Sequence, residues 1–305
     1  MAFVSDVTPV ALFAHARPDL LARTLEGLRA NAVPLIYAFS DGPRGESEIA
    51  NVTAVRAVLH DVAWAEIVHV ERTENFGLRR SILAGATDVF ARHATAIICE
   101  DDLLVAPGAY RYLTAALDHY HDDPRVFSVS AWTHTRVTPT TVGDQPFFSR
   151  RVNTLFWGAY ARSWRGMDQG TSAERLAQYA ADGGDPASYG MDLPLYAASE
   201  GMVNHWDVQF IADHLARGGL SLCPPWTMVE HMGYDPRATN ARSDPTWDAP
   251  IERAAPPIPP VWPTVEEHPE IAALWRRAVE IELATGRPRE WRARLRTVLQ
   301  RLRGQ

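Results

Sequence analysis

The chain of 305 residues contains no lysine, so arginine supplies all 30 of its basic residues. This absence excludes mechanisms that need a lysine, such as Schiff-base chemistry or the phosphate-binding lysine of a Walker A loop. Arginine used throughout in place of lysine is typical of a GC-rich bacterial genome. The formal net charge of -7 argues against a general nucleic-acid binder.

Cysteine is also scarce, since Cys99 and Cys223 are the only two and each lies in an apolar run. Two such residues make neither a disulfide framework nor a thiolate metal cluster, and they fit a reducing compartment. No stretch approaches the roughly 20 apolar residues that span a bilayer. The N-terminus has no basic region of the kind that opens a signal peptide. We therefore expect a cytoplasmic protein.

Hydrophobic residues make up 46% of the chain and charged residues 22%, which is ordinary for a globular protein with a substantial core. In the first part of the chain, short apolar runs alternate with amphipathic segments of helical length. This alternation predicts strands at 9–14, 35–39, 66–70, 95–99 and 126–129, and helices at 18–31, 46–60, 77–93 and 107–120. Such an order predicts an α/β fold, a mainly parallel sheet with helices on both faces.

The second part is less regular. We predict a strand at 147–160 and a strand at 220–229 that prolines interrupt. We also predict helices at 173–181, 207–217, 266–285 and 289–303. Residues 233–263 are rich in proline and are predicted to form a flexible loop. The predicted organisation is one α/β half over 1–132, a second and smaller half of the same domain over 133–264, and a C-terminal helical extension over 265–305.

An acidic triplet, Glu100-Asp101-Asp102, follows one buried strand directly. Three adjacent carboxylates repel one another, so their ionised forms need a cation or hydrogen bonds. Hard oxygen ligands suit Mn²⁺ or Mg²⁺, which commonly share their shell with substrate phosphates. The alternative is a solvated acidic turn that caps the next helix.

Other polar residues follow neighbouring strand ends, where open α/β sheets bind their ligands. Asp41 is a candidate partner for a base or ribose, or an ordinary Asp-Gly turn residue. Arg17 and Arg79 are candidates for contacts to a diphosphate or base, or exposed arginines at helix starts. Their expected convergence at one sheet edge favours a nucleotide site.

The second half adds candidates of three kinds. Asp207 is a candidate general base, with Trp206 as an apolar wall that raises its pKa, although Asp207 also fits a helix N-cap. His231 is a candidate ligand of a metal or diphosphate, or a structural histidine. Trp157 is the aromatic residue chosen to face a sugar, although most tryptophans belong to a core.

The C-terminal segment 288–303 is strongly basic. Its apolar residues fall on one helical face, namely Trp291, Leu295, Val298 and Leu302. This pattern fits a helix that lies on an anionic membrane surface, and it equally fits a helix that packs on the domain through the same face.

An ordered set of short motifs resembles the GT-A glycosyltransferases, and in particular bacterial relatives of animal N-acetylglucosaminyltransferase I. The similarity spans roughly residues 8–245. The motifs are Phe13-Ala14-His15-Ala16-Arg17-Pro18, Ser40-Asp41-Gly42, Asn75-Phe76-Gly77-Leu78-Arg79, Glu100-Asp101-Asp102, Leu155-Phe156-Trp157-Gly158, Trp206-Asp207 and the stretch from Leu222 to Gly233. The sequence departs from the family pattern in a longer, proline-rich loop after Gly233 and in the tail after about residue 265.

The resemblance implies an inverting, metal-dependent glycosyltransferase that uses a nucleotide-diphosphate sugar, with UDP favoured. It implies that Arg17, Asp41 and Arg79 hold the base and its neighbouring groups. Glu100 and Asp101 would contact uridine or ribose, and Asp102 would bind Mn²⁺ or Mg²⁺. Asp207 would be the base, with Trp157 and Trp206 on the acceptor side, where a glycan, a lipid-linked saccharide or a glycosylated metabolite binds.

Two other functions stay open at this point. One is a non-catalytic protein that binds a carbohydrate or nucleotide, against which the acidic triplet argues. The other is a sugar-nucleotide pyrophosphorylase, a class that typically uses a glycine-rich first loop and a lysine; neither is visible here.

Overall fold

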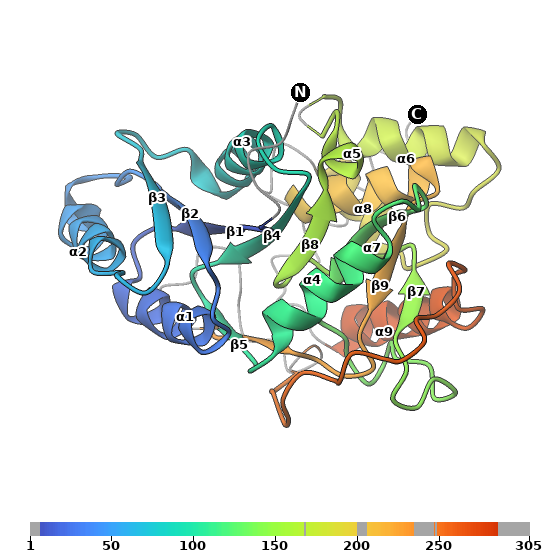
Figure 1. The fold of residues 1–305 in the computed structure, drawn as a ribbon. Coiled ribbons are helices and arrows are strands. Elements are labelled where there is room, and N and C mark those ends of the chain that lie inside the picture. The colour runs from blue at the N-terminus through green and yellow to red at the C-terminus, as the bar shows by residue number, and fades with distance from the viewer. Residues whose placement is uncertain (1–6, 168, 200–205, 235–246, 248, 286–305) are drawn as a thin grey trace.

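The computed structural model describes residues 7–167, 169–199, 206–234, 247 and 249–285. At its centre is an eight-stranded sheet in the order β3-β2-β1-β4-β8-β6-β9-β7. Only β8 and β7 run antiparallel to their neighbours in this sheet, and the other pairs are parallel. The prediction of an α/β fold with a mainly parallel sheet is therefore confirmed (Figure 1).

The first part of the chain forms its elements within a few residues of the predicted bounds. The strands are β1 (Val10–Ala14), β2 (Leu35–Ser40), β3 (Glu66–Glu71), β4 (Thr95–Glu100) and β6 (Val126–Ser130). The helices between them are α1 (Pro18–Ala30), the short η1 (Glu46–Glu48), α2 (Ile49–His60), α3 (Gly77–Phe90) and α4 (Ala109–His119). Apolar runs that are buried on both faces give a strong strand signal, which explains the agreement at β1, β2, β4 and β6.

The second part differs more from expectation. Its strands are β7 (Phe147–Ser149), β8 (Trp157–Tyr160), β9 (Leu220–Cys223) and β10 (Val229–His231). Its helices are α5 (Ala161–Trp164), α6 (Ser172–Ala181), α7 (Asp192–Ala198), α8 (Trp206–Arg217) and α9 (Ile271–Thr285). The single strand predicted over 147–160 is wrong, because β7 and β8 occupy separate positions in the sheet.

Proline divides the strand predicted over 220–229. After β9 the chain reaches Pro224 and Pro225, which have no N–H to donate to a ladder. The chain then forms β10, which leaves the main sheet and pairs antiparallel with β5 (Leu103–Val105), a strand that the sequence analysis does not predict. This two-stranded ribbon places His231 opposite Leu103, next to the acidic triplet.

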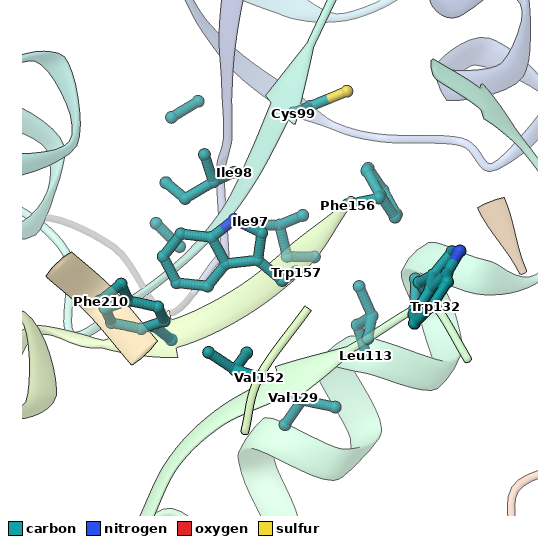
Figure 2. Packing of buried hydrophobic residues seen from close by; sticks show 14 of the residues in the cluster. Ile97, Ile98, Cys99, Leu113, Val129, Trp132, Val152, Phe156, Trp157 and Phe210 are labelled. Carbon is teal, nitrogen blue, oxygen red and sulfur yellow. The ribbon is translucent and has the colours of Figure 1, made fainter. Parts of the chain in front are cut away.

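Helices cover both faces of the sheet (Figure 1). Neighbouring residues of β8 show this, because side chains alternate between faces along a strand. Trp157 packs against Phe210 of α8, with ring centroids 4.4 Å apart. Next to it, a Cβ on Gly158 would meet Leu117 of α4 at 2.8 Å. Figure 2 shows Trp157 and Phe210 within the apolar core between the sheet and α8.

The same sheet contains strands from both predicted halves of the domain. β4 lies before residue 132 and β8 after it, and the two pair antiparallel. The predicted boundary at residue 132 therefore separates two parts of the chain that share one sheet. The domain limits 1–132, 133–264 and 265–305 stay predictions.

The long loop is described only in part, since 235–246 and 248 lie outside the described residues. The part over 249–263 lies along the domain, where the Ala255 N–H donates to the Pro107 carbonyl at 3.0 Å. The Ile251 N–H donates to the Glu230 carboxylate at 3.1 Å. The helix predicted over 289–303, and with it the membrane contact of 288–303, lies outside the described residues. Where the structure describes helices, it contains none with the length and apolar character needed to cross a membrane.

Candidate functional site

The candidate site lies beyond the carboxyl ends of β1, β2 and β4. In the sheet register, Ala14 is level with Ser40, and Phe13 is level with Glu100. The three strands therefore end at one edge, and the residues that follow them meet there. The edge brings together Arg17, Asp41 and the triplet Glu100-Asp101-Asp102, as the strand order in open α/β sheets predicts.

Arg17 binds the two aspartates of the triplet. Its Nη2 donates to Asp101 Oδ1 at 2.8 Å and lies 2.8 Å from Asp102 Oδ2. The Asp101 side chain is held further by the His15 N–H, which donates to its Oδ2 at 2.9 Å. Both carboxylates are buried, so this one guanidinium offsets part of a charge that water does not reach.

Burial and charge act differently on the two aspartates. Burial raises the pKa of Asp101 to about 6, although the Arg17 charge opposes that rise. Burial also acts to raise the pKa of Asp102, but the hydrogen bond and charge of His231, together with Arg17, outweigh it and lower that pKa. Asp102 is therefore the aspartate that stays ionised at neutral pH most firmly, as a metal ligand must.

The raised pKa of Asp101 predicts a pH effect on stability. Between its ordinary value of 3.8 and about 6, the folded chain holds a proton on Asp101 that the unfolded chain has released. The free energy of unfolding therefore falls as pH rises through this window, by about 1.4 kcal/mol per pH unit from this group. The free energy of unfolding is measured by urea denaturation without metal at several pH values. We expect it to lack this pH dependence in Asp101→Asn. If it changes with pH equally in the wild type and in Asp101→Asn, Asp101 is not the group that titrates.

Asp102 has one oxygen that lacks a partner. Its Oδ2 faces Arg17 and lies 3.3 Å from His231 Nε2, whereas its Oδ1 is buried and has no hydrogen-bond partner. His231 Nδ1 is likewise buried without one. A buried anionic oxygen without a partner is costly, and a cation would remove the cost. The donor set of a carboxylate with a nearby imidazole therefore fits Mn²⁺ or Mg²⁺ that takes its remaining ligands from water and phosphate.

Gly233 approaches this carboxylate closely. A Cβ on Gly233 would collide with Asp102 Oδ2 and would lie 3.0 Å from Arg17 Nη1. The Met232 N–H beside it donates to the Asp102 carbonyl at 2.8 Å. A side chain at position 233 would therefore push the Asp102 carboxylate out of its present position.

Gly233→Ala is expected to weaken Mn²⁺ binding by about 10–100-fold, the usual cost of disturbing a group that orients a ligand. The added methyl group displaces the Asp102 carboxylate, although Gly233 is not itself a candidate metal ligand. Calorimetric titration with Mn²⁺ measures the effect. Gly45→Ala is the matched control, because a Cβ there meets nothing within 4 Å. Equal Mn²⁺ affinity in both variants would place the cation away from Asp102.

Asp207 lies in the first turn of α8. Burial raises the pKa of Glu100 well above its ordinary value, and the charges of nearby carboxylates, Asp207 among them, add to the rise. Asp207 is therefore close enough to Glu100 for its charge to act on that carboxyl. Residues 200–205, which precede it, lie outside the described part.

Arg79 and Asp41 make contacts within the protein. Arg79 Nη2 donates to Gln209 Oε1, which ties the start of α3 to α8 near Asp207. The Asp41 carboxylate accepts from the N–H groups of Phe76 at 2.8 Å and Gly77 at 3.0 Å. Asp41 therefore caps the start of α3 in this structure, and its contact with a base, like that of Arg79, stays a prediction.

The structure does not place the two acceptor-side tryptophans on a surface. Trp157 is fully buried and Trp206 is 3% exposed, and their rings stack with centroids 6.0 Å apart. A ring without exposed surface has no face to offer a sugar. The acceptor role expected of Trp157 and Trp206 is therefore corrected to a core role, because β8 directs Trp157 beneath α8 (Figure 2).

Two residues of the site have no assigned role in the sequence analysis. His15 Nε2 lies 3.1 Å from the Gly42 carbonyl and 3.0 Å from Asn75 Nδ2. Asn75 Nδ2 also donates to the Gly42 carbonyl at 2.8 Å. The three residues join the loops after β1, β2 and β3. His15 and Asn75 both lie in the motifs that resemble the GT-A glycosyltransferases, and this is the sequence signal that could have identified them.

No family model matches the chain, and no curated protein matches it. Among solved structures it is similar to a mannosyltransferase from Pyrobaculum calidifontis in complex with GDP-Man and Mn²⁺, at 16% identity over 70% of this chain and 77% of that chain, with a TM-score of 0.37. It is also similar to a UDP-glucose pyrophosphorylase complexed with UDP-glucose, at 8% identity over 72% and 91%, with a TM-score of 0.37. A third is 4-diphosphocytidyl-2C-methyl-D-erythritol synthase from Anaerococcus prevotii, at 11% identity over 57% and 77%, with a TM-score of 0.34. TM-scores of this size support no inference about function. The functional argument therefore rests on the residues of the site itself.

Proposed function

We propose that this chain is an inverting, metal-dependent glycosyltransferase that uses a nucleotide-diphosphate sugar, with UDP as the favoured nucleotide. One observation carries the proposal: Asp102 Oδ1 is a buried carboxylate oxygen without a hydrogen-bond partner, at the sheet edge where α/β folds bind nucleotides. The ordered motifs that resemble GT-A glycosyltransferases support the same conclusion.

Asp102 would hold the divalent cation, with His231 as the second candidate ligand. Mn²⁺ or Mg²⁺ bound there would neutralise charge on the two phosphates of the donor and on the leaving nucleotide diphosphate. Arg17 keeps Asp102 and Asp101 in place, and it sets the local charge balance before the donor arrives. Glu100 and Asp101, which precede Asp102 in the triplet, are the candidates for contacts to the ribose or uracil.

Asp207 is the proposed general base. It would accept the proton of an acceptor hydroxyl as that oxygen attacks the anomeric carbon from the face opposite the leaving phosphate. The new C–O bond forms as the bond to the diphosphate breaks, so a single displacement inverts the configuration. The charge interaction between Asp207 and Glu100 supports this placement beside the donor edge.

The acceptor is proposed to be a glycan, a lipid-linked saccharide or a glycosylated metabolite. A cytoplasmic location with peripheral membrane contact through 288–303 fits a lipid-linked acceptor and stays a prediction.

A thermal-shift panel of UDP, GDP, dTDP and CMP, each with and without Mn²⁺, tests the proposal. A ligand that binds the folded chain raises its melting temperature. We expect one nucleoside diphosphate to stabilise the protein only when Mn²⁺ is present, and the corresponding nucleotide sugar to be hydrolysed slowly under the same conditions.

Other outcomes identify other functions. Stabilisation without any turnover of the nucleotide sugar would indicate a binding protein. Release of sugar 1-phosphate and a nucleoside triphosphate on addition of pyrophosphate would indicate a pyrophosphorylase. If no nucleotide shifts the melting temperature of folded protein, this sheet edge is not a nucleotide site and the proposal fails.

A further inference from the structure

A second group of metal-ligand side chains lies at the opposite end of the sheet order from β7. His60 is the last residue of α2, and His69 and Glu71 lie two residues apart on the edge strand β3. Figure 1 shows α2 beside this end of the sheet. His60, His69 and Glu71 form what we name the edge cluster, which is separate in sequence and in strand position from the acidic triplet.

The ligand atoms of the edge cluster point at one another. The atoms lie within 4.8 Å of each other, with His60 Nε2 2.9 Å and His69 Nδ1 3.6 Å from Glu71 Oε1. The two imidazole centroids are 5.0 Å apart. Tetrahedral zinc with bonds of about 2.0–2.1 Å keeps its ligand atoms about 3.3 Å apart. The observed separations therefore need only small side-chain movements to bind an ion.

The least exposed member of the cluster has no hydrogen-bond partner on its ligand atom. The His69 side chain is 9% exposed, and its Nδ1 has no hydrogen-bond partner. Its other nitrogen, Nε2, lies 2.9 Å from the hydroxyl of Ser40, which is fully buried. When His69 Nε2–H donates to that hydroxyl, Nδ1 presents its lone pair to the cluster. A hydrogen bond of this kind on the second ring nitrogen is the usual support of a metal-binding histidine.

The surrounding charges are compatible with a cation. Glu71 Oε2 faces Arg56 Nη1 at 3.4 Å, which leaves Oε1 for the two imidazoles. Burial lowers the pKa of His69, and the charges of His60 and Arg56 also act to lower it, against the raising effect of Glu71. Arg56 and the two histidines are the charged or titratable groups that face Glu71 in the contacts of the described residues.

We propose that His60 Nε2, His69 Nδ1 and Glu71 Oε1 form a binding site for a divalent transition metal of the zinc class. Two imidazoles and one carboxylate suit Zn²⁺, whereas the oxygen-rich edge at Asp102 suits Mn²⁺ or Mg²⁺. Three protein ligands leave a fourth position to water. The bound ion would join the end of α2 to the edge strand β3 and stabilise the folded chain.

Zinc titration of the full, tag-free chain tests this site. The titration follows treatment with chelator and is run in excess Mg²⁺, which occupies the oxygen-rich edge. We expect one Zn²⁺ to bind, and His60→Asn and Glu71→Gln each to weaken it by about tenfold or more. Both side chains are exposed, at 63% and 40%, so these variants keep the fold. Co²⁺ in place of Zn²⁺ should give the visible absorption of a tetrahedral site in the wild type but not in these two variants.

Two controls separate this site from others. His121→Asn removes an exposed histidine that lies 4.0 Å from Asp122 and should leave the Zn²⁺ affinity unchanged. Asp102→Ala should also leave it unchanged. Three results would each overturn the proposal. They are no Zn²⁺ binding by the wild type, a Zn²⁺ affinity of His60→Asn and Glu71→Gln equal to that of the wild type, and loss of Zn²⁺ binding in Asp102→Ala. None of these results depends on glycosyltransferase activity, so the two proposals fail separately.

Discussion

Asp207→Asn is expected to lower sugar transfer by about 10²–10⁴-fold, the usual contribution of a general base. The asparagine keeps the size of the side chain but cannot accept a proton from the acceptor hydroxyl. Nucleotide binding in Mn²⁺ should stay close to wild type, because Asp102 and Arg17 are untouched. The measurement pairs transfer kinetics under saturating donor with a nucleotide titration of the same variant.

The control for this variant is Asp88→Asn, an exposed carboxylate on α3 that pairs with Arg92. It should leave transfer unchanged. Wild-type turnover in Asp207→Asn would move the base elsewhere. The alternative bases would be Asp192 and Glu200. Asp192 is a poor one, because it is buried and bound to Arg151 at 2.6 Å, and Glu200 lies outside the described residues. Loss of nucleotide binding would make Asp207 a donor contact.

Asp102→Ala is expected to remove the Mn²⁺ dependence of nucleotide binding, with affinity in Mn²⁺ falling by about 100-fold or more, beyond the usual effect of a residue that only orients a ligand. The substitution deletes the one buried carboxylate oxygen of the triplet that has no hydrogen-bond partner. Without it, the charge on the diphosphate has no cation held by the protein. Calorimetric titration with UDP, or with the nucleotide that the thermal panel selects, measures the change.

The variant must also be shown to fold. Arg17 keeps Asp101 as a partner at 2.8 Å, so the edge retains one ion pair after the change. Asp102→Asn is the companion variant, because it preserves the shape and a hydrogen-bond acceptor for Arg17 while removing the charge. Melting temperatures near wild type in the absence of metal establish folding. Unchanged Mn²⁺-dependent affinity in both variants would reject Asp102 as the ligand.

The first part of the fold was predictable because its signals are local. The apolar runs of β1, β2 and β4 are buried along their length, and each ends near the residue that the sequence pattern predicts. A parallel sheet then forces Arg17, Asp41 and the triplet to one edge. The residues of the candidate edge could be listed in advance for that reason.

The second part was less predictable because its strands are short and their partners are distant. β8 has four residues and pairs with both β4 and β6, and β5 pairs with β10 more than a hundred residues later. No local periodicity reveals such pairings. The same limit applies to Trp157, whose place beneath α8 depends on which strands flank it.

By itself the sequence determined the fold class, the positions of the first strands along the chain, the acidic triplet and the absence of lysine chemistry, because these follow from composition and local pattern. Only the tertiary structure decided which oxygen of Asp102 lacks a partner, that Gly233 closes over it, and that Arg17 binds the triplet. It alone also placed His60 beside His69 and Glu71. Partners of this kind are set by the pairing of distant segments, and burial then fixes which polar atoms keep a hydrogen bond and which require an ion.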